Sequence, residues 1–298
     1  MDIINYIIDN DIGNYKENQS IANYTTYRVG GIVKVIVHPK TKEKLQLLMQ
    51  YIKKNNLNYK IIGNGSNLLF SDNYYDGVII KLNHLNEIKI KGNKVYASSG
   101  VKLLKLAFLT ADNNLSGLER ISGIPATIGG IVYMNAGCYD SMASDIIDKV
   151  YILDDNLNFK TLSNKEMNFG YRTSLLKIKN YICLGVSFNL KLGNKEDIRN
   201  EILEYKALRL NKQPINYPNA GSVFKNPKDT GVGRIIDELG LKGYTIGGAM
   251  VSLKHANFII NYNKASSNDI LNLINYIKKE VELKKGIKLE LEQELVNW

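Results

Sequence analysis

A glycine-rich stretch near the middle of the chain restricts its fold more than any other part of the 298-residue sequence. It covers residues 122–139 (SGIPATIGGIVYMNAGCY), and a second such stretch, residues 63–69 (GNGSNLL), follows an apolar run at 59–62. Glycine lets the backbone approach a ligand closely, and consecutive backbone N–H groups in such loops bind anions. Two loops of this kind predict a ligand with two phosphates, such as a dinucleotide.

Neither loop has the spacing of the two most common phosphate-binding motifs. The pattern GxGxxG directly after a strand and the pattern GxxxxGK[ST] are both absent from the sequence. A Rossmann site or a P-loop is therefore not supported. Taken singly, each loop is also compatible with an ordinary connection between secondary-structure elements.

The composition is that of a folded protein, with 44% hydrophobic and 23% charged residues and a formal net charge of +10. The lysines are scattered and no nucleic-acid-binding signature occurs, so we expect no nucleic-acid partner. Cys138 and Cys183 form no CxxC or Cys/His cluster, which predicts reduced thiols, no metal site and a cytoplasmic protein. The N-terminus has no basic leader and no apolar run reaches about 18 residues, so we expect neither a signal peptide nor a membrane span.

Hydrophobic periodicity and capping residues outline a chain of mixed helices and strands. Thr41 is a candidate N-cap for an amphipathic helix, and Ser266 with Asp269 forms a candidate capping box for a long helix that continues beyond Val281. Strands are expected at 32–37, 59–62, 77–81, 87–90, 95–98, 149–153, 181–190 and 258–261, with helices near 101–113 and 232–239. Residues 1–20 predict a short helix and a polar turn. A change to charged, helical sequence places a domain boundary within residues 191–213.

The last segment, residues 288–296, alternates leucine with glutamate and predicts a strand. Its carboxylates, at 290, 292 and 294, would share one face, where one of them could act as a general acid. The ordinary alternative is a solvated sheet face.

Two further segments carry candidate chemistry. In residues 169–174 (FGYRTS), Arg172 could offer a fixed guanidinium to a carboxylate. In residues 219–227 (NAGSVFKNP), Ser222 follows two small residues, and Lys225 and Asn226 supply a charge and an amide. A surface arginine and a glycine turn are the ordinary alternatives. The histidines, His38, His84 and His255, are expected to be structural, and only His255 warrants a test.

Together these segments resemble one family, the UDP-N-acetylenolpyruvoylglucosamine reductases. Five blocks match in order, and the resemblance covers nearly the whole chain: residues 25–31 (TTYRVGG), 63–69, 122–130 with 134–137 (MNAG), 169–174 and 220–227 (AGSVFKNP). Residues 241–243 (LKG) and 255–258 (HANF) extend the match.

The resemblance implies an α+β fold. It would consist of a two-subdomain FAD-binding domain of the PCMH (vanillyl-alcohol-oxidase) type, followed by an α+β substrate-binding domain. We place the first FAD-binding subdomain at residues 1–75 and the second at 76–195. The substrate-binding domain would cover 196–298, with its last strand returning toward the flavin.

The resemblance also implies noncovalently bound FAD and NADPH. The FAD pyrophosphate would lie on the two glycine loops. The cofactor-binding residues implied by the matching blocks are Tyr27, Arg28, Gly63, Asn64, Gly65, Ser66, Asn67, Leu68, Ser122, Gly123, Ile124, Pro125, Thr127, Gly129, Gly130, Asn135 and Gly137. Candidate substrate-binding residues are Gln213, Lys225, Asn226 and Asn257.

The implied reaction transfers hydride from NADPH to FAD and then to the vinyl carbon of UDP-N-acetylglucosamine enolpyruvate. Negative charge then develops on the neighbouring carbon and its carboxylate, and preorganised charge stabilises such an enolate. Arg172 and Glu292 match the family's stabilising residues, and Ser222 matches the serine that protonates the enolate. Serine is a weak acid, so a neighbour, for which Lys225 is the nearest candidate in sequence, would ease loss of its proton.

Three positions depart from the family pattern or leave it open. A gap-free alignment from Gly286 places the catalytic acid at Glu292, with Gln293 where an aliphatic residue is usual, whereas a shift of two residues would select Glu294. Alanine occupies position 126, where glycine is commoner. The connection after Pro227 is short, so the chain resembles the subclass that lacks a tyrosine-bearing loop insertion.

Two other functions stay open at this point. A different flavin oxidase of the same fold would accept oxygen and would not need Ser222. A non-enzymatic flavin- or nucleotide-binding protein would tolerate loss of Arg172 and Glu292. On the reductase interpretation the partners are small molecules only, and we expect a monomer. The sequence does not indicate which residues bind uridine.

Overall fold

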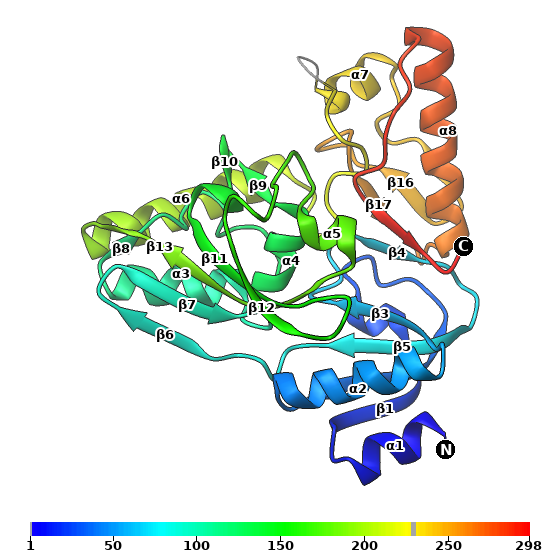
Figure 1. Ribbon diagram of the computed structural model, residues 1–298. Coiled ribbons are helices and arrows are strands. Elements are labelled where there is room, and N and C mark those ends of the chain that lie inside the picture. Colours follow the sequence, from blue (N-terminus) through cyan, green and yellow to red (C-terminus); the bar gives the residue numbers. More distant parts are fainter. Residues whose placement is uncertain (1, 228–230) are drawn as a thin grey trace. The chain divides into compact units, whose positions relative to one another are not determined.

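The computed structural model describes residues 2–227 and 231–298 (Figure 1). The contacts within the chain group it into two compact units. The first unit comprises Met1–Glu17, Val35–Asn64 and Gly77–Ala207, and the second comprises Asn18–Lys34, Gly65–Asp76 and Leu208–Trp298. Both units are built from separate stretches of sequence. The sequential division into 1–75, 76–195 and 196–298 stays a prediction.

The larger sheet of the first unit is antiparallel and has the order β12-β11-β13-β7-β6. Its strands are β6 (Ile88–Lys91), β7 (Lys94–Ser98), β11 (Ile147–Leu153), β12 (Phe159–Ser163) and β13 (Ile182–Asn189). Helix α3 (Leu103–Asp112) and helix α4 (Ile128–Met134) contribute to the same buried core, and α4 packs against β7 and β13. Four of these strands were expected from the sequence, whereas β12 was not.

A second sheet has the order β1-β2-β5-β3. It contains β1 (Gly13–Ser20), β2 (Ile32–Pro39), β5 (Tyr75–Lys81) and β3 (Asn58–Ile62), and β3 runs parallel to β5. Helix α2 (Lys42–Lys54) buries Leu45, Leu48, Met49 and Ile52 in a core shared with these strands. Thr41 caps it as predicted, since its hydroxyl accepts a hydrogen bond from the Lys44 N–H at 3.3 Å.

The remaining elements of the first unit are short, except for the helix at its end. They are α1 (Ile3–Asp9), β8 (Leu115–Ser116), β9 (Gly137–Cys138), β10 (Ser141–Met142), a 3₁₀ helix (Ala143–Asp145), α5 (Leu175–Lys179), β14 (Lys191–Leu192) and α6 (Lys195–Lys212). Helix α6 lies within the segment 191–213 where the sequence predicted a boundary, and the unit division falls inside it, after Ala207.

In the second unit, helix α8 (Ser267–Lys285) packs against a small antiparallel sheet of β15 (Thr245–Ile246), β16 (Ala249–Val251) and β17 (Ile259–Asn261) (Figure 1). The predicted capping box is confirmed: the Ser266 hydroxyl accepts from the Asp269 N–H at 3.0 Å, and the Asp269 carboxylate accepts from the Ser266 N–H at 2.9 Å. The unit also contains a 3₁₀ helix (Ile21–Tyr24), β4 (Leu68–Phe70), α7 (Val232–Glu238) and β18 (Glu294–Val296).

The sequence interpretation was wrong in two places. Residues 13–20, expected to end in a polar turn, form strand β1. Of the long strand expected at 288–296, only β18 forms, and it pairs in parallel with β4. The residues before it make a single bridge, between Phe224 and Leu291, because they lie against the segment that follows Ser222 and have no extended sheet neighbour.

Within residues 2–227 and 231–298, the structure contains no helix with both the length and the apolar character needed to span a membrane.

Candidate functional site

The two glycine loops touch each other in the first unit. A Cβ atom on Gly63 would lie 2.5 Å from the Thr127 hydroxyl oxygen, so a larger residue would force the Thr127 side chain to move. The Asn64 side-chain amide donates to the Pro125 carbonyl at 2.9 Å. These residues come from two distant parts of the sequence, and both parts are predicted to bind the same dinucleotide. The fold brings them together.

A partly buried lysine, Lys81, lies beside the first loop, and no pattern in the sequence selects it. The Lys81 ammonium group donates to the Gly63 carbonyl oxygen at 2.7 Å. Burial, together with the charge of Lys102, lowers the pKa of Lys81 from 10.5 to about 8. A cation held in this way beside a predicted phosphate site could contribute to binding an anionic cofactor.

The second loop packs closely against residues near it in sequence and against Ser99. Ser122 is buried, and its hydroxyl donates to the Glu119 carbonyl at 2.7 Å. A Cβ on Gly129 would lie 3.0 Å from the Ser99 Cβ, and one on Gly137 would lie 2.4 Å from the Ser141 carbonyl oxygen. Gly130 has more space, since the nearest atom to its Cβ position is 3.6 Å away. Gly123 and Ile124 complete the turn, in which the Ile124 N–H donates to Ile121.

Arg172 lies on a tight turn whose geometry depends on Asn135. The turn is closed by hydrogen bonds between the backbones of Gly170 and Thr173, and Arg172 has a φ of 56°. Its guanidinium donates to the Gly137 carbonyl at 3.0 Å and lies over the Tyr171 ring. The buried Asn135 side chain donates to the Gly170 carbonyl at 3.0 Å and accepts from the Ser144 N–H. Asn135, predicted to bind cofactor, therefore also connects the second glycine loop to the Arg172 turn.

In the second unit, the 25–31 block packs on the continuation of the first glycine loop. Gly65 has a φ of 67°, and its Cβ would lie 2.5 Å from the Tyr24 carbonyl oxygen, so glycine is required there. The Thr26 N–H donates to the Gly65 carbonyl at 3.2 Å. Tyr27 is completely buried and Arg28 is exposed. Of these two predicted cofactor residues, Arg28 has the accessible side chain.

Ser222 and Glu292 lie on neighbouring segments. Phe224 and Leu291 pair in an antiparallel bridge, and the Glu292 N–H donates to the Val223 carbonyl at 2.9 Å. Glu294 belongs instead to β18, where it pairs with Leu68 of β4. The backbone pairing therefore places Glu292 beside the residues that follow Ser222, and Glu294 beside β4 at the end of the first glycine loop.

Asn67 connects the same terminal residues to the first glycine loop. Its side-chain amide donates to the Glu292 carbonyl at 3.0 Å, and its carbonyl accepts from the Glu294 N–H at 2.9 Å. The Ser66 carbonyl oxygen is the closest neighbour of Gly221, 3.8 Å from its Cβ position. Asn67 and Ser66, both predicted cofactor residues, thus lie next to the two predicted catalytic segments of this unit.

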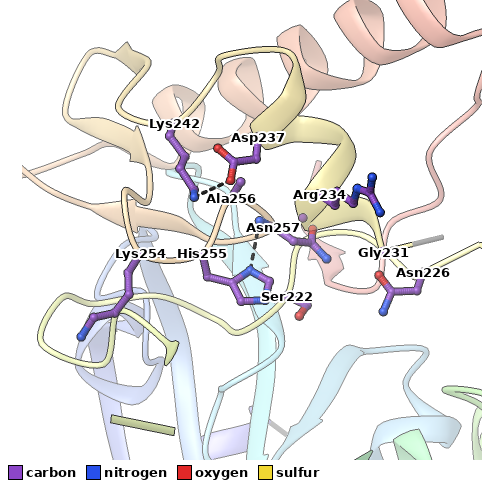
Figure 2. Close-up of a pocket in the computed structure, with 11 residues that line it drawn as sticks. Ser222, Asn226, Gly231, Arg234, Asp237, Lys242, Lys254, His255, Ala256 and Asn257 are labelled. Atoms are coloured by element: carbon purple, nitrogen blue, oxygen red, sulfur yellow. Dashed lines mark hydrogen bonds and ion pairs between the residues drawn. The ribbon is translucent and has the colours of Figure 1, made fainter. Parts of the chain in front are cut away.

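Ser222 lines a cavity of about 360 Å³ in the second unit (Figure 2). Its walls are rich in basic and amide side chains, Asn226, Arg234, Lys242, Lys254, His255 and Asn257, and also include Asp237, Gly231, Gly233 and Ala256. Lys242 pairs with Asp237 at 2.6 Å, and Lys254 donates to the Leu210 carbonyl at 2.9 Å. Such a cavity is suited to a polar, negatively charged ligand.

His255 is held as a neutral ring in this cavity. Its Nδ1 accepts a hydrogen bond from the Asn257 N–H at 3.2 Å (Figure 2). Burial, and next the charge of Lys242, lower the pKa of His255. The Nδ1 contact assigns the proton of the neutral ring to Nε2, which makes His255 a potential hydrogen-bond donor. From the sequence, His255 was only a weak candidate for the site. Lys242 and Lys254 were not predicted as site residues.

The four candidate substrate residues have different surroundings. Lys225 pairs with Glu290 and not with Ser222, so the structure does not place its ammonium where the proton-transfer idea needs it. The Asn226 side chain accepts from the Val232 N–H at 3.1 Å, and the Asn257 side chain is bound to Phe224. The Gln213 amide oxygen is buried without a hydrogen-bond partner in the described parts of the chain, as a ligand-binding group would be.

Metal sites and disulfides, neither of which the sequence predicts, can be examined in residues 2–227 and 231–298. In that part, no group of three or more His, Cys, Asp or Glu residues is arranged to hold a metal ion. Neither Cys138 nor Cys183 forms a disulfide there, and burial raises the pKa of Cys183 to about 12. His38 contacts the Asn83 side chain and lies near the ring of His84.

Comparison with known families agrees with this division of features. Residues 33–158 match a family described as an FAD binding domain, and residues 213–296 match the C-terminal domain of UDP-N-acetylenolpyruvoylglucosamine reductase. The two matches cover the glycine loops and the serine-lined cavity, respectively.

Full-length relatives support the same assignment. The chain is 42% identical over 292 residues to the UDP-N-acetylenolpyruvoylglucosamine reductase of Anoxybacillus flavithermus, covering 97% of each chain. It is 43% identical over 293 residues to that of Clostridium tetani, covering 98% of this chain and 95% of the relative.

Solved structures extend the comparison to the fold. The crystal structure of the Thermus caldophilus enzyme has a TM-score of 0.81 and 34% identity, covering 95% of this chain and 98% of that one. Berberine bridge enzyme from Eschscholzia californica, at 15% identity and a TM-score of 0.52 over 65% of this chain, shares the fold alone. The expected α+β fold, with its PCMH-type FAD-binding domain, is confirmed, and the chain belongs to the UDP-N-acetylenolpyruvoylglucosamine reductase family.

Proposed function

We propose that this chain uses NADPH and bound FAD to reduce UDP-N-acetylglucosamine enolpyruvate to UDP-N-acetylmuramate. Its family membership makes it an FAD-dependent oxidoreductase of peptidoglycan precursor synthesis. The proposal adds that NADPH is the reductant and that individual residues have the roles given below. Cytoplasmic location and a monomeric state stay predictions from the sequence.

The observation that carries the proposal is the pairing of the Ser222 segment with the Glu292 segment. The Glu292 N–H bonds to the carbonyl of Val223, the residue after Ser222, and Ser222 lines the basic cavity. A reaction that creates an enolate needs a proton donor and a stabilising acid in one place. Backbone pairing across some 70 residues of sequence supports this arrangement.

Within the proposal, three side chains act on the enolpyruvyl group. Protonated Glu292 donates a hydrogen bond to the substrate carboxylate, on which negative charge accumulates. Arg172 supplies a guanidinium, which stays charged at any relevant pH. Ser222 gives its hydroxyl proton to the carbon next to the carboxylate, which completes the reduction.

The basic cavity would bind the UDP part of the substrate. A diphosphate is a dianion, and Lys242, Lys254 and Arg234 supply positive charge around a space of about 360 Å³. Asp237 partly neutralises Lys242, so the cavity is less strongly charged than its composition suggests. Neutral His255 can donate a hydrogen bond without adding charge.

The residues of the glycine loops fit a dinucleotide. Gly63, Asn64, Pro125 and Thr127 are in contact, and the Lys81 ammonium is held beside Gly63. These residues, with the others of the two loops and the 25–31 block, would hold FAD. When bound, FAD supplies the hydride that reaches the vinyl carbon.

Two anaerobic spectroscopic steps test the proposal. The purified protein is expected to be yellow, to lose its flavin absorbance with NADPH, and to regain it when the enolpyruvyl sugar is added. Analysis of the product should find UDP-N-acetylmuramate. Reoxidation by oxygen but not by the enolpyruvyl sugar would favour a different flavin oxidase, and a colourless protein that binds no FAD would reject the proposal.

A further inference from the structure

A buried glutamine connects three functional segments of the second unit. Gln293 is only 3% exposed, and its side-chain amide makes three of the four hydrogen bonds that such a group can make, using both of its donors. Its oxygen accepts from the Tyr27 hydroxyl at 3.1 Å, and its nitrogen donates to the carbonyls of Ala220 at 3.1 Å and Gly221 at 3.2 Å. These partners belong to the 25–31 block and to the turn before Ser222.

The backbone on both sides of Gln293 is fixed as well. Asn67 accepts the Glu294 N–H and donates to the Glu292 carbonyl, so the glutamine is held between two hydrogen bonds to one residue. The Tyr27 ring is completely buried and cannot move away from the amide without opening the core. Gln293 therefore has a fixed position from which to hold the turn.

The turn before Ser222 needs such support because of its backbone conformation. Gly221 has a φ of 75°, and its N–H donates to the Asn219 side-chain oxygen at 3.0 Å. The carbonyl that Gln293 binds belongs to the peptide joining Gly221 to Ser222, so the bond limits rotation of that peptide plane. On the other side of Ser222, the Val223 N–H donates to the Asn257 carbonyl at 2.9 Å.

We propose that Gln293 is a positioning residue for proton transfer: its amide fixes the Gly221–Ser222 peptide and thereby the direction of the Ser222 hydroxyl. This inference rests on the proposed role of Ser222. Misplacing a reacting group by a fraction of an ångström slows a reaction without removing any catalytic atom. Gln293 itself does not touch the substrate in this scheme.

The first test separates the two half-reactions in Gln293→Met, a change that keeps side-chain length and removes all three hydrogen bonds. Reoxidation of the reduced enzyme by the enolpyruvyl sugar is expected to slow by about tenfold, and flavin reduction by NADPH to stay within about twofold of the native rate. Gln46→Met is the matched control, since the Gln46 amide donates to the Leu157 carbonyl in the first unit. It should leave both rates unchanged.

A second measurement separates positioning from stability, using the FAD-free chain. Gln293→Met leaves the buried Tyr27 hydroxyl without a partner and should lower the urea midpoint, whereas Tyr27→Phe combined with Gln293→Met should recover much of that loss. Reoxidation in the double variant should stay slow, because the carbonyls of Ala220 and Gly221 remain unsupported. FAD affinity is measured for each variant.

Gln293→Glu adds a pH readout. A protonated carboxylic acid can accept from Tyr27 and donate to one carbonyl, whereas a carboxylate repels both carbonyls. Reoxidation relative to the native enzyme should therefore rise as the pH falls from 8 to about 5.5.

Native reoxidation in Gln293→Met, equal slowing of both half-reactions, or recovery of reoxidation together with stability in the double variant would each overturn the inference. If Ser222→Ala also reoxidises normally, the failure lies in the proposed role of Ser222. If only Ser222→Ala is slow, the failure lies with Gln293.

Discussion

Asn257 binds both backbone groups of Phe224 with the two ends of its side-chain amide. The Phe224 N–H donates to Oδ1 at 3.0 Å, and Nδ2 donates to the Phe224 carbonyl at 2.8 Å. Asn257 is 3% exposed, and its own carbonyl accepts from Val223. The side chain thus acts as a strand partner for the segment that follows Ser222, and any contact it makes with substrate stays a prediction.

Asn257→Ala should consequently destabilise the protein. The change removes two buried hydrogen bonds and leaves the Phe224 N–H and carbonyl unpaired, which costs about 2–4 kcal/mol. Urea denaturation of the FAD-free chain measures the loss. Asn216→Ala, at an exposed position, is the control and should change stability by less than about 0.5 kcal/mol. Equal effects of the two changes would contradict the assignment.

Ser222→Ala should affect one half-reaction only. Reduction of the flavin by NADPH does not use the hydroxyl, whereas protonation of the enolate does, so reoxidation by the enolpyruvyl sugar should fall by about 100-fold or more. Anaerobic stopped-flow absorbance measures both rates. A similar decrease in both half-reactions would argue against a proton donor at this position.

Glu292→Gln and Glu294→Gln distinguish the two possible alignments of the chain's end. The structure pairs Glu292 with Val223 beside Ser222, and Glu294 with Leu68 of β4. Reoxidation should therefore slow by about 100-fold in Glu292→Gln and by less than about threefold in Glu294→Gln. The opposite order would select Glu294 as the acid.

Lys81→Met should change how stability depends on pH. The pKa of Lys81 falls from 10.5 to about 8 in the fold, so between these values the unfolded chain binds more protons and native stability rises with pH. Below pH 8 both states are charged and the fold carries a penalty on the order of 3 kcal/mol. The variant lacks the penalty and loses the bond to Gly63, worth about 1 kcal/mol.

Urea midpoints between pH 7 and 10 test this expectation. The native protein should gain stability relative to Lys81→Met as the pH rises through this range, because Lys81 loses its proton more readily in the fold than in the unfolded chain. Tyrosines and the other lysines titrate in both proteins, so their contribution cancels in the difference. A constant difference between the two proteins would show that Lys81 keeps its ordinary pKa in the fold.

The features that could be predicted from the sequence are those set by local chemistry. The Thr41 cap and the Ser266–Asp269 capping box depend on residues three apart, and both are present. Gly63 and Gly65 occur where another backbone or side chain comes within 2.5 Å, a constraint that leaves a visible pattern in the sequence.

The features that were missed depend on distant partners. Gln293 appeared only as a departure from the family pattern, because its partners Tyr27 and Ala220 are far away in sequence. Alternation predicted a long strand at 288–296, but only residues 294–296 have a strand neighbour, β4. Lys81 looked like any other lysine in a basic chain, since its burial arises from the tertiary packing of β5.

The second unit takes its core from both ends of the chain. Tyr27, Val29 and Leu69 pack with residues of α7 and α8, the Ser71 N–H donates to the Val296 carbonyl, and the indole of Trp298 donates to the Leu69 carbonyl at 3.1 Å. During synthesis on the ribosome, these early residues emerge long before their partners. The unit cannot complete its core until the residues up to Val296 have been synthesised, and a fragment starting at Leu208 would lack part of its own interior.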